Sequence, residues 1–353
     1  MPEEPGLESD RVEDQAHPRE VYDLMGQDAA LALAARAIRS GRPPQAWLLG
    51  GPPGIGKATL AYRIARYLLR YGAVGDGPEN LAVPKTDIVA RQVEAESHPG
   101  LLVLKRREGD RGRLQTVLSV QEVRKLESFF GLTSGAGGWR VVIVDTADDM
   151  NDQAANALLK VLEEPPRRAI ILVLSHSPGR LLPTIRSRCR RLELRPLPPD
   201  ILQGALARLL PDADDDARTA LADVSEGSLG LALRLAGEGG MALAQDAENL
   251  LSARGPLDVS ATLVLGDRVA RAPEGISHFG QFLAAAMSQR IRARASRESG
   301  SIDLTALNRE IAAWEKIVAA FYRAEGLHLD ARQTVLSAAS ALHALQRPPA
   351  RRM

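Results

Sequence analysis

The stretch that decides the fold is a glycine-rich loop that reads Gly51-Pro52-Pro53-Gly54-Ile55-Gly56-Lys57. It follows a short apolar run, residues 46–49, and leads into a helical pattern. A strand, a glycine loop, a lysine and a helix in this order predict a phosphate-binding P-loop. Glycines let successive N–H groups turn toward an anion, and the helix directs its positive end there. Because the spacing, the lysine and both flanking elements are present, this prediction is favoured over an ordinary glycine turn, and ATP or ADP fits the loop.

One position departs from the P-loop pattern. The lysine is normally followed by Ser or Thr, whose hydroxyl binds Mg²⁺, whereas here Lys57 is followed by Ala58. Thr59 does not substitute for it, because one step along a helix rotates a side chain by roughly 100°. We therefore expect residues 51–59 to accept a triphosphate, with Mg²⁺ bound weakly if at all.

The bulk composition is that of a soluble globular protein. At 353 residues the chain is too long for one compact core, and two or three domains are expected. Hydrophobic residues make up 45% of the chain and charged residues 25%. The net charge of +1 provides no strong field for nucleic acid or a membrane. No apolar run approaches the ~20 residues that a membrane helix needs, so we expect a cytoplasmic protein with no membrane partner.

Cysteine content and the first residues restrict the protein class further. The single cysteine, Cys189, excludes both a disulfide within the chain and a zinc site built from cysteines. Residues 1–20 are acidic, contain prolines and lack an apolar segment. This composition predicts a disordered lead-in and not a signal peptide.

A second nucleotide-site motif follows the P-loop at the end of an apolar run. Residues 140–144 predict a buried strand, and Asp145 would emerge at the carboxyl end of the sheet, where ligands bind. The next residue is Thr146, at the position where hydrolysing enzymes of this type place a glutamate. A hydroxyl cannot act as a general base near neutral pH. Asp148 and Asp149 are close in sequence, but a shift of two residues redirects a carboxylate, and we do not expect either to replace the glutamate.

Two further segments complete the pattern of this half. Residues 151–164 predict a helix with a stop at Pro165, and residues 169–174 predict another buried strand. That strand ends at Ser175-His176-Ser177. These polar residues either respond to a γ-phosphate or cap the following turn, and the sequence leaves both alternatives open.

Several segments together carry a family resemblance. They are Gly26-Gln27, the loop 51–57, Asp145, the run Ala157-Leu158-Leu159-Lys160-Val161-Leu162-Glu163-Glu164-Pro165-Pro166, and Ser187-Arg188-Cys189. With these motifs the chain resembles the clamp-loader branch of the AAA+ ATPases, strongly over residues 20–195 and only in character beyond. The resemblance implies an α/β P-loop domain with a parallel five-stranded sheet at 21–196, a small helical lid at 197–240, an all-α collar for oligomerisation at 241–346, and a tail at 347–353.

The departures distinguish this chain from the motor subunits of that family. Motors carry Lys-Thr in the P-loop, Asp-Glu after the second strand and an arginine in the lid motif Gly-Ser-Leu-Arg. Here the corresponding pairs are Lys57-Ala58 and Asp145-Thr146, and the lid motif reads Gly227-Ser228-Leu229-Gly230. The pattern is similar to the non-motor subunits, which brace the complex. Such a chain binds nucleotide at most and does not hydrolyse it.

Arg188 lies in a segment with five arginines, Arg186, Arg188, Arg190, Arg191 and Arg195. On spacing alone a solvated basic patch, with or without DNA phosphate, is as good an interpretation as a catalytic one. The resemblance implies that Arg188 is a finger inserted in trans into the ATP site of the adjacent subunit. A planar cation at the γ-phosphate accelerates hydrolysis by roughly 10³–10⁵-fold.

The resemblance also implies the partners. These are the gamma/tau and delta subunits in a hetero-pentameric ring and, indirectly, the sliding clamp and primer-template DNA. Many family members bind zinc through four cysteines after the P-loop helix, and the absence of cysteine from residues 71–98 excludes zinc here.

Helical patterns fill the C-terminal half, at 259–270, 279–296, 304–324 and 331–345. An apolar stripe, Phe279, Phe282, Leu283 and Met287, is interpreted as the core of a helical bundle and not as a cofactor site.

Two alternatives to the brace hypothesis remain. One is an active ATPase motor resembling gamma/tau, against which Ala58, Thr146 and Gly230 argue. The other is a DNA-binding protein that uses the arginine segment alone, which the nearly neutral charge and the lack of interspersed aromatic residues disfavour.

Overall fold

The computed structural model describes residues 16–73, 76–106, 117–131, 138–213, 215–237, 239–297, 304–327 and 329–346. It divides the chain into two compact units, the first comprising residues up to Ala205 with Gly227–Leu231, and the second Leu206–Glu226 with residues from Ala232 onward. Each unit is described by itself, and the finer division into lid and collar stays a prediction. The tail at 347–353 and most of the lead-in, residues 1–15, lie outside the described residues.

The first unit is built on a parallel sheet of five strands in the order β2-β3-β4-β1-β5, which confirms the expected sheet. The strands are β1 (Ala46–Gly50), β2 (Leu101–Leu104), β3 (Arg140–Val144), β4 (Ala169–Ser175) and β5 (Arg190–Glu193). At the centre, Leu48 of β1 lies opposite Val173 of β4 and Arg191 of β5. Because all strands are parallel, their carboxyl ends meet at one edge and their amino ends at the other.

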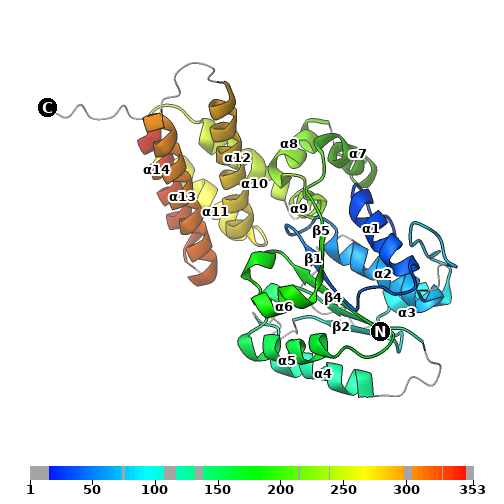
Figure 1. The fold of residues 1–353 in the computed structure, drawn as a ribbon. Helices are drawn as coiled ribbons and strands as arrows, with labels where there is room; N and C mark the ends of the chain where they lie inside the picture. Colours follow the sequence, from blue (N-terminus) through cyan, green and yellow to red (C-terminus); the bar gives the residue numbers. More distant parts are fainter. Residues whose placement is uncertain are drawn as a thin grey trace, which may run out of the picture. The chain divides into compact units, whose positions relative to one another are not determined.

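Helices cover both faces of this sheet, giving three layers (Figure 1). One face carries α1 (Asp28–Arg39), α2 (Lys57–Tyr71) and α3 (Ile88–Glu94); the other carries α4 (Val120–Gly131), α5 (Asp152–Glu163) and α6 (Pro183–Arg188). Alternate strand residues serve the two cores: Trp47 and Leu49 pack with α1 and α2, whereas Leu48 packs with α5 and α6. Burial on both faces explains why the strands read as continuous apolar runs.

Local signals account for most of the helix boundaries. The Asn151 side chain accepts a hydrogen bond from the backbone N–H of Ala154 at the start of α5, and Asp87 does the same for Val89 at the start of α3. The sequence analysis did not predict α3 or α6. Both are short, at seven and six residues, so neither contains enough apolar repeats to establish a helical period.

The end of the expected lead-in is ordered, contrary to the prediction for residues 16–20. His17 is buried, and Arg66 of α2, itself fully buried, donates hydrogen bonds to the backbone oxygens of Arg19 and Val21. The guanidinium of Arg66 also lies 4.1 Å from the centre of the Tyr22 ring. An arginine buried this deeply needs partners for its donors, and the backbone of residues 19–21 provides them. This strap fixes the chain that leads into α1.

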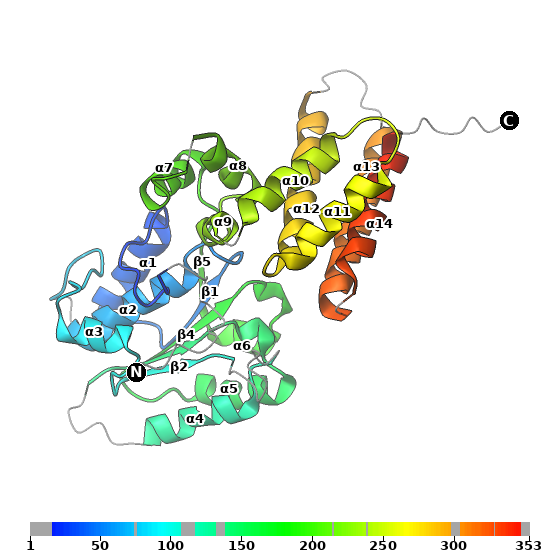
Figure 2. The ribbon, with the colours of Figure 1, turned by 180° about the vertical axis from the view of Figure 1, so that it is seen from behind.

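The remaining helices follow in chain order. They are α7 (Pro199–Leu209), α8 (Asp215–Ser225), α9 (Leu229–Ala236), α10 (Gly240–Ser252), α11 (Val259–Arg271), α12 (Gly275–Arg297), α13 (Leu304–Leu327) and α14 (Ala331–Gln346). In the second unit α11 packs on α14 and α12 on α10 and α13 (Figure 2). The predicted core stripe is confirmed, since Phe279, Phe282, Leu283 and Met287 are all buried. Among the described helices, none combines the length and apolar character required to cross a membrane.

Candidate functional site

The P-loop joins the carboxyl end of β1 to the first turn of α2, in the context that the sequence predicted. Its glycines adopt backbone angles that other residues rarely reach: φ is +139° at Gly51, +73° at Gly54 and +100° at Gly56. A Cβ added to Gly51 would lie 2.5 Å from the backbone oxygen of Leu194. The glycine spacing is therefore needed both for the turn and for its packing against the chain after β5.

Lys57 is the first residue of α2, and its side chain is buried beneath the loop. Its Nζ donates hydrogen bonds to the backbone oxygens of Gly51 (2.7 Å) and Pro52 (2.6 Å). Burial lowers the pKa of Lys57 to about 8, although the charges of Asp145 and Asp148 act in the opposite direction. The ammonium is thus a buried cation directed at the loop, with its donors on neutral carbonyls, and a phosphate would be a stronger partner for it.

The next three loop carbonyls also accept hydrogen bonds from distant segments. The Ser228 hydroxyl donates to Pro53 O (2.8 Å), the backbone N–H of Gly230 to Gly54 O (2.8 Å), and the Gln27 amide to Ile55 O (3.2 Å). Together with the Lys57 bonds, every carbonyl from Gly51 to Ile55 is engaged. The outer surface of the loop is therefore fixed by the chain itself.

Residues 227–230, the lid motif of the sequence analysis, approach the loop closely. A Cβ added to Gly230 would lie 2.7 Å from the Cα of Gly54, and one added to Gly54 would lie 2.4 Å from the Ser228 hydroxyl. Two glycines face each other, and this allows the backbone hydrogen bond between them. In this arrangement position 230 has no space for the arginine that family motors carry.

The first turn of α2 lacks a hydroxyl directly after the lysine. Ala58 is half-buried and packs against the core between the sheet and α2, and Thr59 is also half-buried. The donor set near Lys57 therefore contains the carboxylate of Asp145 but no Ser or Thr at position 58. This set fits the phosphates better than it fits Mg²⁺.

Asp145 follows β3 at the same sheet edge and is buried. Thr146 comes next with φ of +54°, a left-handed conformation that is rare for a β-branched residue. Its hydroxyl lies 3.5 Å from Oδ1 of Asp145. The chain turns sharply here into a short 3₁₀ helix, η1 (Ala147–Asp149), and that turn sets the direction of the two following carboxylates.

Asp148 closes the turn after the central strand β4. Its carboxylate accepts hydrogen bonds from the Ser175 hydroxyl (2.9 Å) and from the backbone N–H groups of His176 (2.6 Å) and Ser177 (3.1 Å). The Ser175 hydroxyl donates to Asp148, and Ser177, which precedes the 3₁₀ turn at Pro178–Arg180, forms no side-chain capping hydrogen bond, so both alternatives for Ser175-His176-Ser177 stay predictions. The three donors hold Asp148 in a structural position, which argues against its use as a base.

Asp149 is bonded to a different segment of the chain from Asp148. Its carboxylate forms an ion pair with Arg106 at 3.1 Å. Burial raises the pKa of Asp149, while Arg106 opposes that rise. The carboxylate that follows Asp148 is thus also committed to a partner within the chain.

Arg188 lies at the opposite edge of the sheet from Lys57. It ends α6, directly before β5, and Arg190 of β5 pairs with Trp47 near the start of β1, whereas the P-loop leaves the end of β1. Its guanidinium donates to the backbone oxygen of Thr184 (3.1 Å) and forms an ion pair with Glu163 (2.7 Å). The side chain is about one-third exposed.

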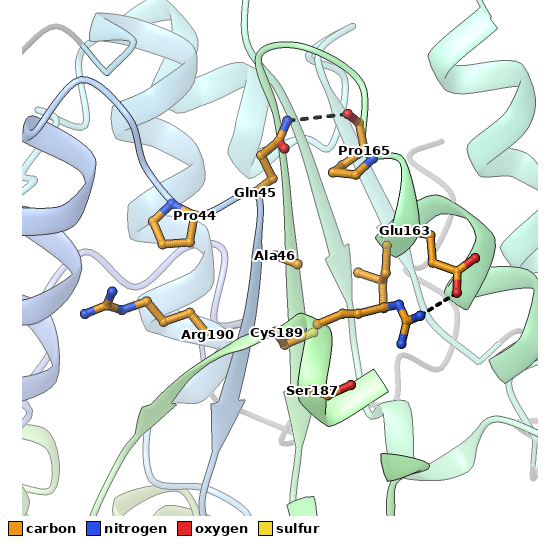
Figure 3. Close-up of a pocket in the computed structure, with 10 residues that line it drawn as sticks. Pro44, Gln45, Ala46, Glu163, Pro165, Ser187, Cys189 and Arg190 are labelled. Atoms are coloured by element: carbon orange, nitrogen blue, oxygen red, sulfur yellow. Dashed lines mark hydrogen bonds and ion pairs between the residues drawn. The ribbon is translucent and has the colours of Figure 1, made fainter. Parts of the chain in front are cut away.

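A shallow open pocket of about 600 Å³ adjoins Arg188 at this amino edge (Figure 3). Its lining residues come from the starts of β1 and β5 and from the ends of α5 and α6: Pro44, Gln45, Ala46, Leu162, Glu163, Pro165, Ser187, Arg188, Cys189 and Arg190. Cys189 is buried, and burial raises the pKa of its thiol to about 11. The thiol is therefore neutral, and the charged groups of the pocket are Arg188, Arg190 and Glu163.

The other arginines of this segment lie on α6, on β5 and just after β5, where Arg195 follows Leu194, the residue that lies against Gly51 of the P-loop. Arg190, Arg191 and Arg195 are exposed on or after the edge strand β5, and Arg186 is half-buried on α6. Within the described ranges, no group of three or more His, Cys, Asp or Glu side chains is arranged to hold a metal ion.

Comparison with known proteins adds to this geometry. Residues 26–198 match the sequence family described as DNA polymerase III, delta subunit. The chain is 41% identical over 202 residues to DNA polymerase III subunit delta' of Pseudomonas aeruginosa, covering 55% of this chain and 56% of the relative. It is 34% identical over 199 residues to the Escherichia coli protein of the same name, covering 56% of each. Over about half of its length, the chain is similar to the delta' subunits of DNA polymerase III.

The similarity has a defined extent. The chain spans about half the length of the curated relatives it matches, and the family match at residues 26–198 lies in the first unit. Relatives also include DNA polymerase III subunit gamma/tau of Mycobacterium tuberculosis, 30% identical over 204 residues and covering 54% of this chain and 31% of that protein. A solved DNA polymerase III gamma subunit-related protein from Thermotoga maritima has a TM-score of 0.51 at 18% identity, covering 90% of this chain and 100% of that one. The shared fold is that of the AAA+ P-loop proteins.

Proposed function

We propose that this chain is a non-motor subunit of the clamp loader of the bacterial replicative DNA polymerase III. In this role it braces the ring, lends Arg188 to the nucleotide site of an adjoining motor subunit and does not hydrolyse ATP itself. Its partners are the gamma/tau and delta subunits in a hetero-pentamer, and the loaded substrates are the sliding clamp and primer-template DNA. A role in replication places the chain in the cytoplasm.

One observation carries the proposal: Arg188 and the P-loop lie at opposite edges of the same sheet. Arg188 follows α6 at the amino edge, so it cannot reach a nucleotide on Lys57 at the carboxyl edge of its own sheet. An exposed guanidinium beside an open pocket suits contact with a second molecule. Planar bidentate donors favour phosphate as the target.

The P-loop edge supports binding without hydrolysis. Lys57 and the N–H groups of residues 51–57 would hold the phosphates of ATP or ADP, and bound nucleotide would supply negative charge to the buried ammonium. The groups that would hydrolyse that nucleotide are either replaced by other residues or bonded to other parts of the chain. Ala58 offers no metal ligand, Thr146 no base, and Asp148 closes the turn after β4.

The test is hydrolysis by the reconstituted complex after Arg188→Ala. We expect the turnover at the adjoining site to fall by roughly 10³-fold, the lower end of the range for an arginine finger. In a single-turnover experiment, the amplitude of the fast phase of ATP hydrolysis should fall by the share that this one site contributes. Arg190→Ala is the matched control, since it removes an exposed neighbouring charge and should leave the phase intact.

An active motor of the gamma/tau type is the alternative. It predicts ATP turnover by the isolated chain that depends on Lys57, and it gives Arg188 no special weight. An unchanged fast phase in the Arg188→Ala complex would contradict the proposed function.

A further inference from the structure

The pocket at the amino edge contains one charged contact that the proposed function does not explain. Glu163, the last residue of α5, pairs with Arg188 through Oε1 and Nη2 at 2.7 Å, and the bond is drawn at Glu163 in Figure 3. A second bond runs from Nη1 of Arg188 to the backbone oxygen of Thr184, one turn earlier on α6. The two bonds fix the guanidinium from two directions.

This pair is a poor source of stability. The side chain of Glu163 is 51% exposed and that of Arg188 35% exposed. Ion pairs with this exposure contribute little to stability, because water and salt screen the charges and two long side chains lose freedom. The pair therefore matters more for the orientation of the Arg188 guanidinium than for stability.

The guanidinium keeps donors for another partner while it is held. Arginine has five N–H donors in a rigid plane, and the two bonds to Glu163 and Thr184 occupy two of them. Among the described residues, no hydrogen bond occupies the other three, which can meet an anion. A long side chain that is oriented in advance loses less freedom when it meets a phosphate.

Glu163 itself is fixed by its surroundings. Leu158 and Leu162 of α5 are buried against the sheet. After the helix, the backbone oxygens of Pro165 and Pro166 accept hydrogen bonds from the Gln45 amide, just before β1. The carboxylate thus projects from a helix whose end is bonded to the residue before β1.

We propose that Glu163 is a positioning residue that orients Arg188 for the phosphate of an adjoining subunit. The inference rests on the proposed function, because it concerns the role of Arg188 there. Glu163 does not touch the nucleotide: it acts only through the guanidinium that it holds. The Glu163 carboxylate supplies a fixed acceptor, and the guanidinium turns its remaining N–H groups outward.

The test measures single-turnover hydrolysis in the reconstituted complex. Glu163→Ala should slow the fast phase about tenfold with little change in the ATP concentration for half-saturation, because misplacing a catalytic group lowers the rate of chemistry more than binding. Glu163→Gln keeps an acceptor oxygen and should restore most of the rate. Glu164→Ala is the matched control and should leave the phase unchanged, because the bonds of Arg188 within the described ranges go to Glu163 and Thr184 and not to this exposed neighbour.

Adding Glu163→Ala to the Arg188→Ala variant distinguishes a positioning role of Glu163 from a structural role. The residual turnover of that complex comes from its other sites, and adding Glu163→Ala should not lower it further. If Arg188→Ala slows the fast phase but Glu163→Ala does not, or if Glu163→Ala also lowers the residual turnover, this inference is wrong and the proposed function stands. If Arg188→Ala has no effect, both are overturned.

Discussion

The two edges of the central sheet hold their cations, Lys57 and Arg188, in contrasting surroundings. At the carboxyl edge, the cation is buried, its donors rest on the loop's own carbonyls, and the nearby carboxylates Asp148 and Asp149 are engaged in other bonds. At the amino edge, Arg188 is part-exposed beside an open pocket and is held by its bonds to Thr184 and Glu163. The polar groups of the carboxyl edge bond to the chain itself, whereas the Arg188 guanidinium at the amino edge is partly open to solvent. A P-loop in the sequence therefore does not by itself identify the more accessible cation of the chain.

Among the predicted changes in stability that test this comparison of the two edges, the largest concerns Lys57. Its pKa in the folded chain is about 8 against an ordinary value of 10.5, so the folded state binds fewer protons than the unfolded state between these pH values. Stability of the wild type should therefore rise with pH through this window. Relative to Lys57→Met, the gain should be about 3 kcal/mol between pH 8 and 10.5.

Urea denaturation of both chains across this pH range measures that difference, and the comparison cancels the titration of other groups. A difference that stays constant would mean that Lys57 is not a buried, poorly compensated cation. If excess phosphate or nucleotide removes the pH dependence of stability, that result would support the interpretation of the loop as an anion-binding site.

A somewhat smaller effect is expected for Asp148. Replacing it with Ala removes the acceptor for three donors, one of them the hydroxyl of fully buried Ser175. Buried donors left without a partner should lower the free energy of unfolding by about 2–3 kcal/mol. Asp152→Ala, at an exposed position in the first turn of α5, is the control and should cost less than about 1 kcal/mol. Unchanged stability together with lost ATP turnover would make Asp148 a catalytic group and would reverse the assignment of this edge.

The smallest predicted effect concerns Gly230. A methyl group here would lie 2.7 Å from Gly54 Cα, so the lid segment must shift and weaken its bond to the P-loop. Gly230→Ala should therefore destabilise the chain by about 1–2 kcal/mol in thermal or urea denaturation. Gly204→Ala is the control, because nothing lies within 4 Å of its added methyl group, and it should be neutral or stabilising. Equal behaviour of the two variants would mean that the glycine contact does not fix the loop.

The sequence predicted the elements whose signals are local. The glycine loop, the apolar runs of β1, β3 and β4, and the proline stop after α5 each lie within a short stretch, and the structure has them at nearly the predicted positions. It also predicted that the lead-in extends to residue 20, and this was wrong for residues 16–20. The reason is Arg66, whose buried guanidinium binds that backbone from a distant helix.

The contacts that define the candidate site were less accessible to sequence reasoning. Ser228 and Pro53 are 175 residues apart, and Gln27 reaches the backbone of Arg195 across 168 residues. Gly26-Gln27 was noted only as part of a resemblance, and the pairing of Glu163 with Arg188 was not foreseen, although both lie within quoted motifs. Such pairs depend on how separate segments are folded together, and a single sequence contains no direct signal for them.

The most direct test of the central claim is steady-state ATP hydrolysis by the purified chain with Mg²⁺, compared with its Lys57→Ala variant. If this chain acts by lending Arg188 to a neighbour, neither protein should show turnover above the background of the assay. Turnover by the wild type that Lys57→Ala abolishes would contradict the account, because the carboxyl edge would then be a working ATPase site.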